Sequence, residues 1–306
     1  MKKAMKVFLI LSPCLILVGI ALCFIGVRAG GSTHFGFDFK TGFVDYNKDE
    51  SGQEIESQRQ TLEAFDTISV DVDCMDVEVV EGEEYAVEYR VYHALGFEKL
   101  QCESKNGVLT FVQGGNSSSF PFHFEVNLDF LNWFTSHNRW NSDSYGYYVR
   151  IYVPRGTTLQ DIKVDSDLGE TVIRNLAVDG DVKIDADCGS IELENVTVSR
   201  SCRIESSLGA VDFNNCTLTA AEIELDCGDF EGKEITVLDK LKIDNSLGSI
   251  DLFMKGGLNS QTYRYDCNTD LGSVDLAGED CGSKAKGGNG TAEIILQNDC
   301  GSITLE

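Results

Sequence analysis

Apolar residues recur in a fixed pattern around a series of glycines in the second half of the chain. They stand seven, five and one residue before each glycine, and two and four residues after it. A constant period of about 20 residues is typical of stacked coils. The glycines, at successive intervals of 20, 20, 19, 20, 24 and 29 residues, are Gly169, Gly189, Gly209, Gly228, Gly248, Gly272 and Gly301.

The side of the chain that carries the apolar residues changes at each glycine. Alternate residues of a strand face opposite sides, so the change predicts a corner, and glycine suits a corner because it adopts positive φ without steric cost. A second change occurs at Asn175, Asn195 and Asn215, and asparagine tolerates left-handed turns and can form hydrogen-bonded ladders. The sequence therefore predicts an all-β parallel β-solenoid with about three short strands per coil.

The regular repeats cover residues 159–306. A degenerate coil precedes them at Ile68, Val70, Cys74, Val77 and Val79, with Met75 in the place of the glycine. Residues 65–158 are therefore predicted to form degenerate N-terminal coils. They are interrupted by an insertion at 114–146 that is rich in Ser, Asn and aromatic residues.

Residues 7–27 form a run of 21 positions without a charge. About 20 apolar residues span a bilayer core, and the preceding Lys2, Lys3 and Lys6 favour a cytoplasmic N-terminus. The sequence predicts a cytoplasmic segment 1–6, a single-pass transmembrane anchor at 7–27, a linker at 28–64 and an extracytoplasmic C-terminal domain. A signal peptide cleaved near Ala29 is the alternative.

The charge balance narrows the classes of partner. The 25 Lys and Arg residues face 50 Asp and Glu residues, which gives a net charge of −25. Such a surface repels phosphate backbones and anionic lipid headgroups, so no nucleic-acid partner is expected and the only predicted membrane contact is the N-terminal helix. Because 42% of the residues are hydrophobic, the chain is also not a disordered acidic tail.

The layout resembles the DUF4097 family of adhesin-like bacterial envelope proteins with β-strand repeats. The resemblance rests on the segment YVRIYVPRGTTLQDIKV (148–164), on FDTISVDV (65–72) and on the repeats DSDLGE, DADCGS, ESSLGA, LDCGD and NSLGS. It covers roughly residues 60–306. The insertion at 114–146 departs from the family's arrangement. The resemblance implies a cell-surface, non-enzymatic module.

Cysteines recur in the same positions as Leu, Val and Ile, which predicts small, buried hydrophobic residues rather than reactive thiols. The chain's four histidines, His34, His93, His123 and His137, all lie outside the repeats. No phosphate-binding loop, metal-spaced His/Cys set or dinucleotide fingerprint is present, so no enzyme activity and no cofactor are predicted. The six cysteines expected to point inward in the repeats are Cys188, Cys202, Cys216, Cys227, Cys267 and Cys300, whereas Cys281 lies in a loop and is expected to be exposed.

Acidic residues also form columns along the predicted stack, two and four residues before the glycines. The simpler interpretation is a solvent-exposed face, in which the column two residues before the glycines accepts hydrogen bonds from backbone amides at the corners. The alternative is a face that binds cations such as Ca²⁺, because like charges stacked about 5 Å apart repel each other. The weak cation-site candidates are Asp165, Asp185, Glu205, Glu224 and Asp244.

Two further features bear on partners. The insertion is rich in aromatic residues, which predicts either a cap on the solenoid or a surface for a glycan or protein ligand, with Trp133, Trp140 and Tyr145 as candidates. The chain ends on SITLE, directly in a strand, which predicts an uncovered last coil that could self-associate.

Together these patterns predict a non-enzymatic protein of the cell membrane that presents an acidic solenoid outside the membrane for binding or adhesion. Two alternatives remain open. One is a scaffold that self-assembles through the C-terminal coil, and the other is an accessory protein of envelope-stress signalling.

Overall fold

The computed structural model describes residues 34–38, 42–45, 53–56, 59–93, 100–113, 123–127 and 147–306. The predicted segments 1–6 and 7–27 and the candidates Trp133, Trp140 and Tyr145 lie outside these residues. Within the described part of the chain, no helix has the length and apolar character needed to span a bilayer. The chain forms two compact units, the first made of Met1–Gln53, Tyr92–Gly96 and Asn116–Tyr145, and the second of the remaining residues.

The first unit contains a three-stranded antiparallel sheet. Strand β1 (His34–Asp38) lies between β10 (His123–Asn127) and β2 (Gly42–Asp45). Strands β1 and β2 belong to the segment predicted as a linker, and β10 belongs to the insertion at 114–146.

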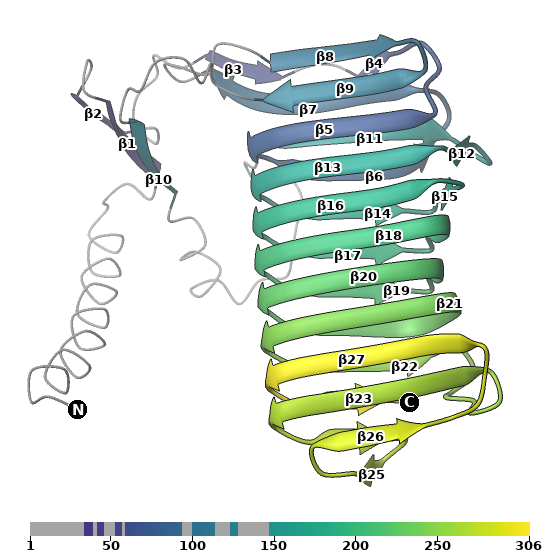
Figure 1. Ribbon diagram of the computed structural model, residues 1–306. Coiled ribbons are helices and arrows are strands. Elements are labelled where there is room, and N and C mark those ends of the chain that lie inside the picture. The colour runs from purple at the N-terminus through teal and green to yellow at the C-terminus, as the bar shows by residue number, and fades with distance from the viewer. Residues whose placement is uncertain are drawn as a thin grey trace, which may run out of the picture. The chain divides into compact units, whose positions relative to one another are not determined.

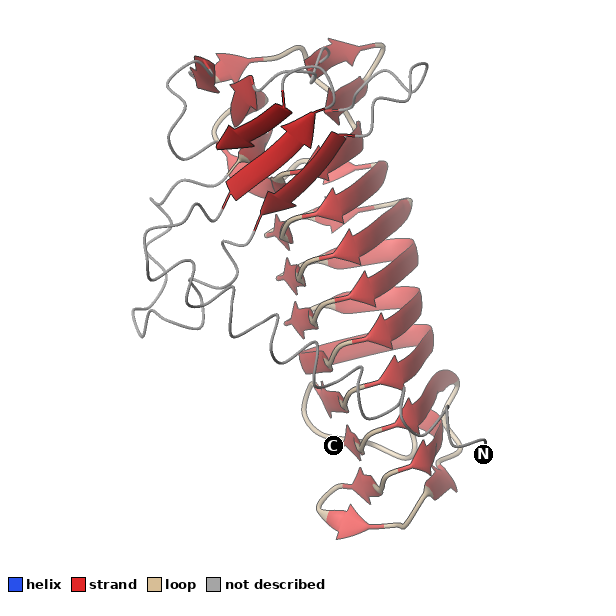
Figure 2. Ribbon diagram, turned by 90° about the vertical axis from the view of Figure 1, so that its left-hand side faces the viewer, coloured by secondary structure: helices blue, strands red, loops and turns tan. Residues whose placement is uncertain are grey.

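The second unit consists of two facing sheets of stacked, mostly parallel strands (Figures 1 and 2). Strand β21 runs through both, because its first residues pair in one sheet and its last residues in the other. The longer sheet contains, in spatial order, β9 (Val108–Gln113), β5 (Thr67–Cys74), β13 (Asp161–Leu168), β16 (Asp181–Cys188), β18 (Thr197–Leu208), β20 (Thr217–Cys227), β21 (Phe230–Leu247), β27 (Ala292–Cys300) and β23 (Tyr263–Leu271).

The opposite sheet follows the same stacking. Its strands are β11 (Tyr148–Pro154), β6 (Asp76–Gly82), β14 (Thr171–Arg174), β17 (Ile191–Glu194), β19 (Val211–Asn214), β21, β22 (Ile250–Met254), β28 (Ile303–Leu305) and β24 (Val274–Leu276). Two further short strands, β12 (Thr158–Leu159) and β15 (Ala177–Val178), lie at the third side of the coils. The prediction of an all-β, solenoid-like stack is confirmed.

The degenerate coil lies in register with the regular repeats. Ile68 pairs with Ile162, Val70 with Val164 and Val77 with Thr171, so β5 and β6 form a coil that stacks on β13 and β14. Met75 is buried at the corner.

The order of the last two coils differs from the sequence order. Strand β27 lies between β21 and β23, and β28 lies between β22 and β24. The prediction that the C-terminal coil ends the stack uncovered is therefore wrong. The long connection after β22, which includes turns at residues 255–262, carries the chain past one position in the stack, and the final strands fill that position.

Antiparallel strands lie at both ends of the stack. At one end β26 (Lys284–Gly287) pairs with β23, and β25 (Glu279–Asp280) pairs with β24. At the other end β8 (Leu100–Lys105) pairs with β9, and β7 (Ala86–His93) pairs with β11 and β4 (Gln60–Thr61); β3 (Gln53–Glu56) also pairs with β7. Such strands satisfy backbone groups that an open edge would leave unpaired.

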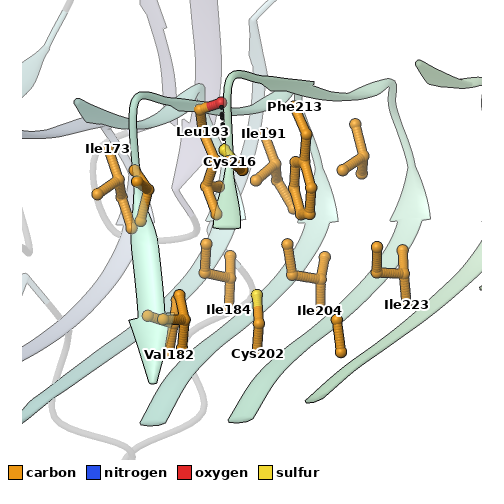
Figure 3. Packing of buried hydrophobic residues seen from close by; sticks show 14 of the residues in the cluster. Ile173, Val182, Ile184, Ile191, Leu193, Cys202, Ile204, Phe213, Cys216 and Ile223 are labelled. Atoms are coloured by element: carbon orange, nitrogen blue, oxygen red, sulfur yellow. Dashed lines mark hydrogen bonds between the residues drawn. The ribbon is translucent and has the colours of Figure 1, made fainter. Parts of the chain in front are cut away.

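The core lies between the two sheets. Figure 3 shows Ile184, Ile204 and Ile223 on one sheet facing Ile191 and Phe213 on the other. Phe213 and Phe230 stack edge to face with ring centroids 5.4 Å apart. Since each coil adds its own row of apolar side chains, the core grows with the number of coils rather than as a single globule.

The chain turns at both predicted places, although two of the seven corner glycines, Gly228 and Gly272, do not have the expected positive φ. Gly209 has a φ of 155°, and Asn175, Asn195 and Asn215 have φ values of 58°, 53° and 51°. Asn195 Nδ2 donates to Asn175 Oδ1 at 2.9 Å, and Asn215 Nδ2 donates to Asn195 Oδ1 at 2.7 Å. The asparagines therefore form the predicted ladder, with Lys255 Nζ donating to Asn215 Oδ1 at its end.

Candidate functional site

The cation-site candidates lie on the outward face of the longer sheet, half-buried and beside basic side chains. Lys163 Nζ lies 3.7 Å from Asp165 Oδ2, and Arg203 Nε lies 2.8 Å from Glu205 Oε1. Asp185 pairs with Lys183 and Asp244 with Lys242 in the same way, whereas Glu224 pairs with Arg203 of the neighbouring strand. We call Asp165, Asp185, Glu205, Glu224 and Asp244 the paired acids.

This pairing relieves the repulsion expected between stacked like charges. The cations come from a column two residues earlier, and sequence reasoning about the acids alone missed them. Among the described residues no group of three or more His, Cys, Asp or Glu side chains has the arrangement of a metal site.

A second acidic column lies closer to the glycine corners, and its members are exposed except for Asp73, which is half-buried. Its members, which we call the ridge-side acids, are Asp73, Asp167, Asp187, Asp226, Asp299 and Asp270 in spatial order. None of the ion pairs formed within the described part of the chain involves them. The carboxylates that do accept hydrogen bonds from corner amides are instead Asp76, from Glu170 N, and Asp229, from Ser249 N.

Partial burial and neighbouring carboxylates raise the pKa of two of the ridge-side acids. Partial burial, with Asp187, Asp165 and Asp71 nearby, raises the pKa of Asp167 above its ordinary value of 3.8. Burial and the charges of Asp167 and Asp71 raise the pKa of Asp73. The ionised ridge-side acids at this end of the stack therefore disfavour folding slightly at neutral pH.

We expect Asp167→Asn to stabilise the protein at pH 7. The folded state raises the Asp167 pKa, so the ionised carboxylate costs stability above that pKa, and the cost disappears below the unfolded value, where both states are protonated. The gain should be about 0.5 kcal/mol or less, because water screens this exposed side chain. Thermal unfolding at pH 7 and near pH 3 measures it. The gain should vanish near pH 3, and the control Asp165→Asn, which loses Lys163, should show no gain at either pH.

An exposed apolar column runs directly beside the ridge-side acids. It consists of the residues that precede the corner glycines, which the sequence pattern predicted to point inward. That prediction is wrong for this position: Leu168, Leu208, Leu247 and Leu271 are between 39% and 71% exposed, Cys300 is exposed, and Cys74, Cys188 and Cys227 are half-buried. The strand already bends at these residues, so two consecutive side chains face outward before the corner.

The stack order gives this column a strict alternation. Along the stack it reads Cys74, Leu168, Cys188, Leu208, Cys227, Leu247, Cys300, Leu271. The alternation appears only because β27 lies between β21 and β23, since in sequence order Leu271 directly follows Leu247. We call these eight residues the corner ridge.

The inward position is instead the third residue before the glycine. Except at Leu225, it carries small or polar residues, which the apolar pattern does not reveal. The residues at this position, all buried, are Ser166, Ala186, Ser206, Leu225, Asn245, Thr269 and Asn298. Asn298 Nδ2 donates to Gly248 O at 2.7 Å, and Thr269 Oγ1 donates to Gly301 O at 2.8 Å. The side chains of Asn298 and Thr269 therefore bind corner carbonyls from inside the coil.

The cysteines fall into two groups. Cys202, Cys216 and Cys267 are buried, as predicted. Burial raises the pKa of Cys202 and Cys267 to about 12 and that of Cys216 to about 11, so their thiolates are scarcely populated at neutral pH. Cys281 is exposed, as predicted, whereas the inward prediction is wrong for Cys188, Cys227 and Cys300.

The geometry defines a class of protein, an all-β solenoid-like stack whose outer surface is made of straight columns of side chains. The sequence matches the model of the family described as Toastrack DUF4097 over residues 65–306. The chain therefore belongs to the DUF4097 family, as the repeat motifs predicted.

Solved structures of low sequence identity are similar to the chain. A "putative cell adhesion protein" from Clostridium sporogenes has 10% identity, covers 83% of this chain and 98% of its own, and gives a TM-score of 0.30. A "putative adhesin" from Bacteroides fragilis has 12% identity, with 82% and 96% coverage and a TM-score of 0.39. Another from Parabacteroides distasonis has 13% identity, with 83% and 98% coverage and a TM-score of 0.37. No curated protein matches the sequence.

Proposed function

We propose that this protein is a non-enzymatic, membrane-anchored binding protein of the cell envelope, with the solenoid outside the membrane. The observation that carries the binding role is the corner ridge, because the large apolar side chains exposed on the described surface are gathered there. Four of the five such residues, Leu168, Leu208, Leu247 and Leu271, lie on this one line. Apolar side chains gathered on a surface are typical of an interaction site.

The buried thiols of Cys202 and Cys267 are unsuited to nucleophilic catalysis. Cys202 and Cys267 occupy core positions that Ile or Leu could fill, and their raised pKa values keep them protonated. A nucleophilic cysteine needs a lowered pKa and an adjacent base. The uncharged run at 7–27 and the lysines before it support the anchor and the orientation.

Thiol labelling tests the location of the solenoid. Cys281 and Cys300 are exposed, so a membrane-impermeant maleimide should label the full-length protein in intact cells, and a Cys281→Ser/Cys300→Ser variant should lose most of the label. Labelling that requires lysis would place the solenoid inside the cell and contradict the proposal.

Sedimentation with isolated cell-wall sacculi tests the binding role. The full-length chain should co-sediment with sacculi if its ligand is a cell-wall glycan. If its ligand is a protein, the protein fraction of the envelope should retain it. If a glycan is the ligand through the aromatic insertion, Trp133→Ala/Trp140→Ala should abolish co-sedimentation with sacculi. Absence of the chain from every envelope fraction would overturn the binding role.

A further inference from the structure

The corner ridge and the ridge-side acids together form one composite surface. The ridge offers four leucines. Steps of about 4.8 Å between coils give its eight residues a length on the order of 34 Å and place successive leucines about 9.6 Å apart. The alternating cysteines are smaller and leave shallow gaps between the leucines. The adjacent residue of most coils is an exposed aspartate, such as Asp187 beside Cys188 or Asp226 beside Cys227.

The ridge-side acids differ from the paired acids in their ion pairing. Each of the paired acids has a Lys or Arg from its own chain, whereas the ridge-side acids have no such partner among the described residues. A column of unpaired like charges beside an exposed apolar line is complementary to a ligand with apolar side chains flanked by cations.

We propose that the corner ridge binds a segment of a partner protein that carries apolar side chains flanked by Lys or Arg. The leucines would contact the apolar side chains of the segment, and the ridge-side acids would pair with its cations. This inference deepens the proposed function and rests on it, since it names the surface and the chemistry of the partner.

Other occupants fit the same surface less well. A second copy of this chain that docked through its own ridge would bring two columns of aspartates together, and like charges in contact at an interface are unfavourable. An anionic lipid surface would meet the same repulsion.

Binding of a fluorescent peptide of alternating Leu and Lys tests the proposal with the full-length protein. Fluorescence anisotropy should show saturable binding that weakens as salt is raised. A peptide of alternating Leu and Glu should not bind, and a peptide of alternating Ser and Lys should bind at least about tenfold more weakly, because it lacks the apolar contacts.

Matched variants locate the binding surface. Leu208→Ser/Leu247→Ser should weaken binding of the Leu/Lys peptide at least about tenfold, and Leu238→Ser, an exposed leucine away from the ridge, should leave it unchanged. Asp187→Asn/Asp226→Asn should weaken binding and reduce its salt dependence, and the exposed pair Asp239→Asn/Glu279→Gln should not. Unchanged thermal unfolding of each variant checks that the fold is intact.

Three outcomes would overturn the proposal. Equal loss of binding in the ridge variants and in Leu238→Ser would show that the peptide binds elsewhere. Stronger binding to anionic vesicles than to the peptide would indicate a membrane surface. A dimer in analytical ultracentrifugation that Leu208→Ser/Leu247→Ser dissociates would indicate a second copy. If the ridge variants still co-sediment with envelope material, the proposed function stands and the ridge proposal fails.

Discussion

We expect Gly209→Ala to lower the free energy of unfolding by more than about 4 kcal/mol. A Cβ built on Gly209 overlaps the carbonyl oxygen of Gly189 in the neighbouring coil, and the φ of 155° is itself unfavourable for alanine. Backbone atoms cannot rotate away as a side chain can. The Gly209 N–H also donates to Cys227 O at 3.0 Å, so a shift of this corner breaks hydrogen bonds to both neighbouring coils. Chemical denaturation measures the loss.

Gly156→Ala is the matched control for this corner. Gly156 also has a positive φ, of 74°, but a Cβ there meets nothing within 4 Å. Its substitution should cost only the left-handed backbone penalty, about 1 to 2 kcal/mol. Equal effects of the two substitutions would show that φ strain, and not contact between coils, explains the glycine repeat.

Deletion of residues 291–306 should destabilise the solenoid by several kcal/mol. The deletion removes β27 and β28, which lie inside the stack, and so separates β21 and β22 from β23 and β24. It also removes the buried side chains of Ile294, Leu296, Ile303 and Leu305, each worth about 1.5 to 3 kcal/mol of burial. Thermal unfolding should show a lower midpoint and a less cooperative transition.

Deletion of residues 258–290 provides the comparison. It removes the outermost coil with its antiparallel strands and restores an interval of 20 residues between Gly248 and Gly301. Strand β27 can then follow β22 with a connection of ordinary length, so this variant should retain a stack one coil shorter and a higher midpoint than the deletion of 291–306. The opposite ranking would contradict the stacking order.

The repeat pattern was sufficient to predict the class of fold. Gly209 and Asn195 occupy the corners that were predicted where the apolar residues change sides of the chain. Ile204 and Val211 are buried in the core, as the apolar pattern predicted. Even the degenerate coil at Ile68 and Val77 has the predicted register. These features are local to one coil or its neighbour, so a one-dimensional pattern contains them.

Two features depended on information that the pattern does not contain. The place of β27 depends on where a long connection leads the chain, which residue spacing does not specify. The outward direction of Leu208 depends on where the strand begins to bend, and its apolar character suggested the core. The inward position was not recognised from the apolar pattern, because it often carries a polar residue such as Asn298, whose side chain donates to a corner carbonyl.

The candidate site followed from both of these features. The corner ridge needs the outward leucines and the inserted β27, because only this arrangement places Cys300 between Leu247 and Leu271. The paired acids were found from the sequence, and four of the five have a basic partner two residues earlier in the same strand. Only the pairing of Glu224 with Arg203 of the neighbouring strand required the register between strands.

A single engineered disulfide tests the stacking order that forms the corner ridge. In a Cys227→Ala/Leu247→Cys variant, residue 247 has one neighbouring thiol on the ridge, Cys300. Adjacent strands lie about 4.8 Å apart, within the range of Cα distances of about 4.4–6.8 Å that a disulfide spans. Mild oxidation followed by peptide mapping should therefore find a bridge between residues 247 and 300. A free thiol at 247, with Cys300 equally free, would contradict the inserted position of β27 and with it the corner ridge.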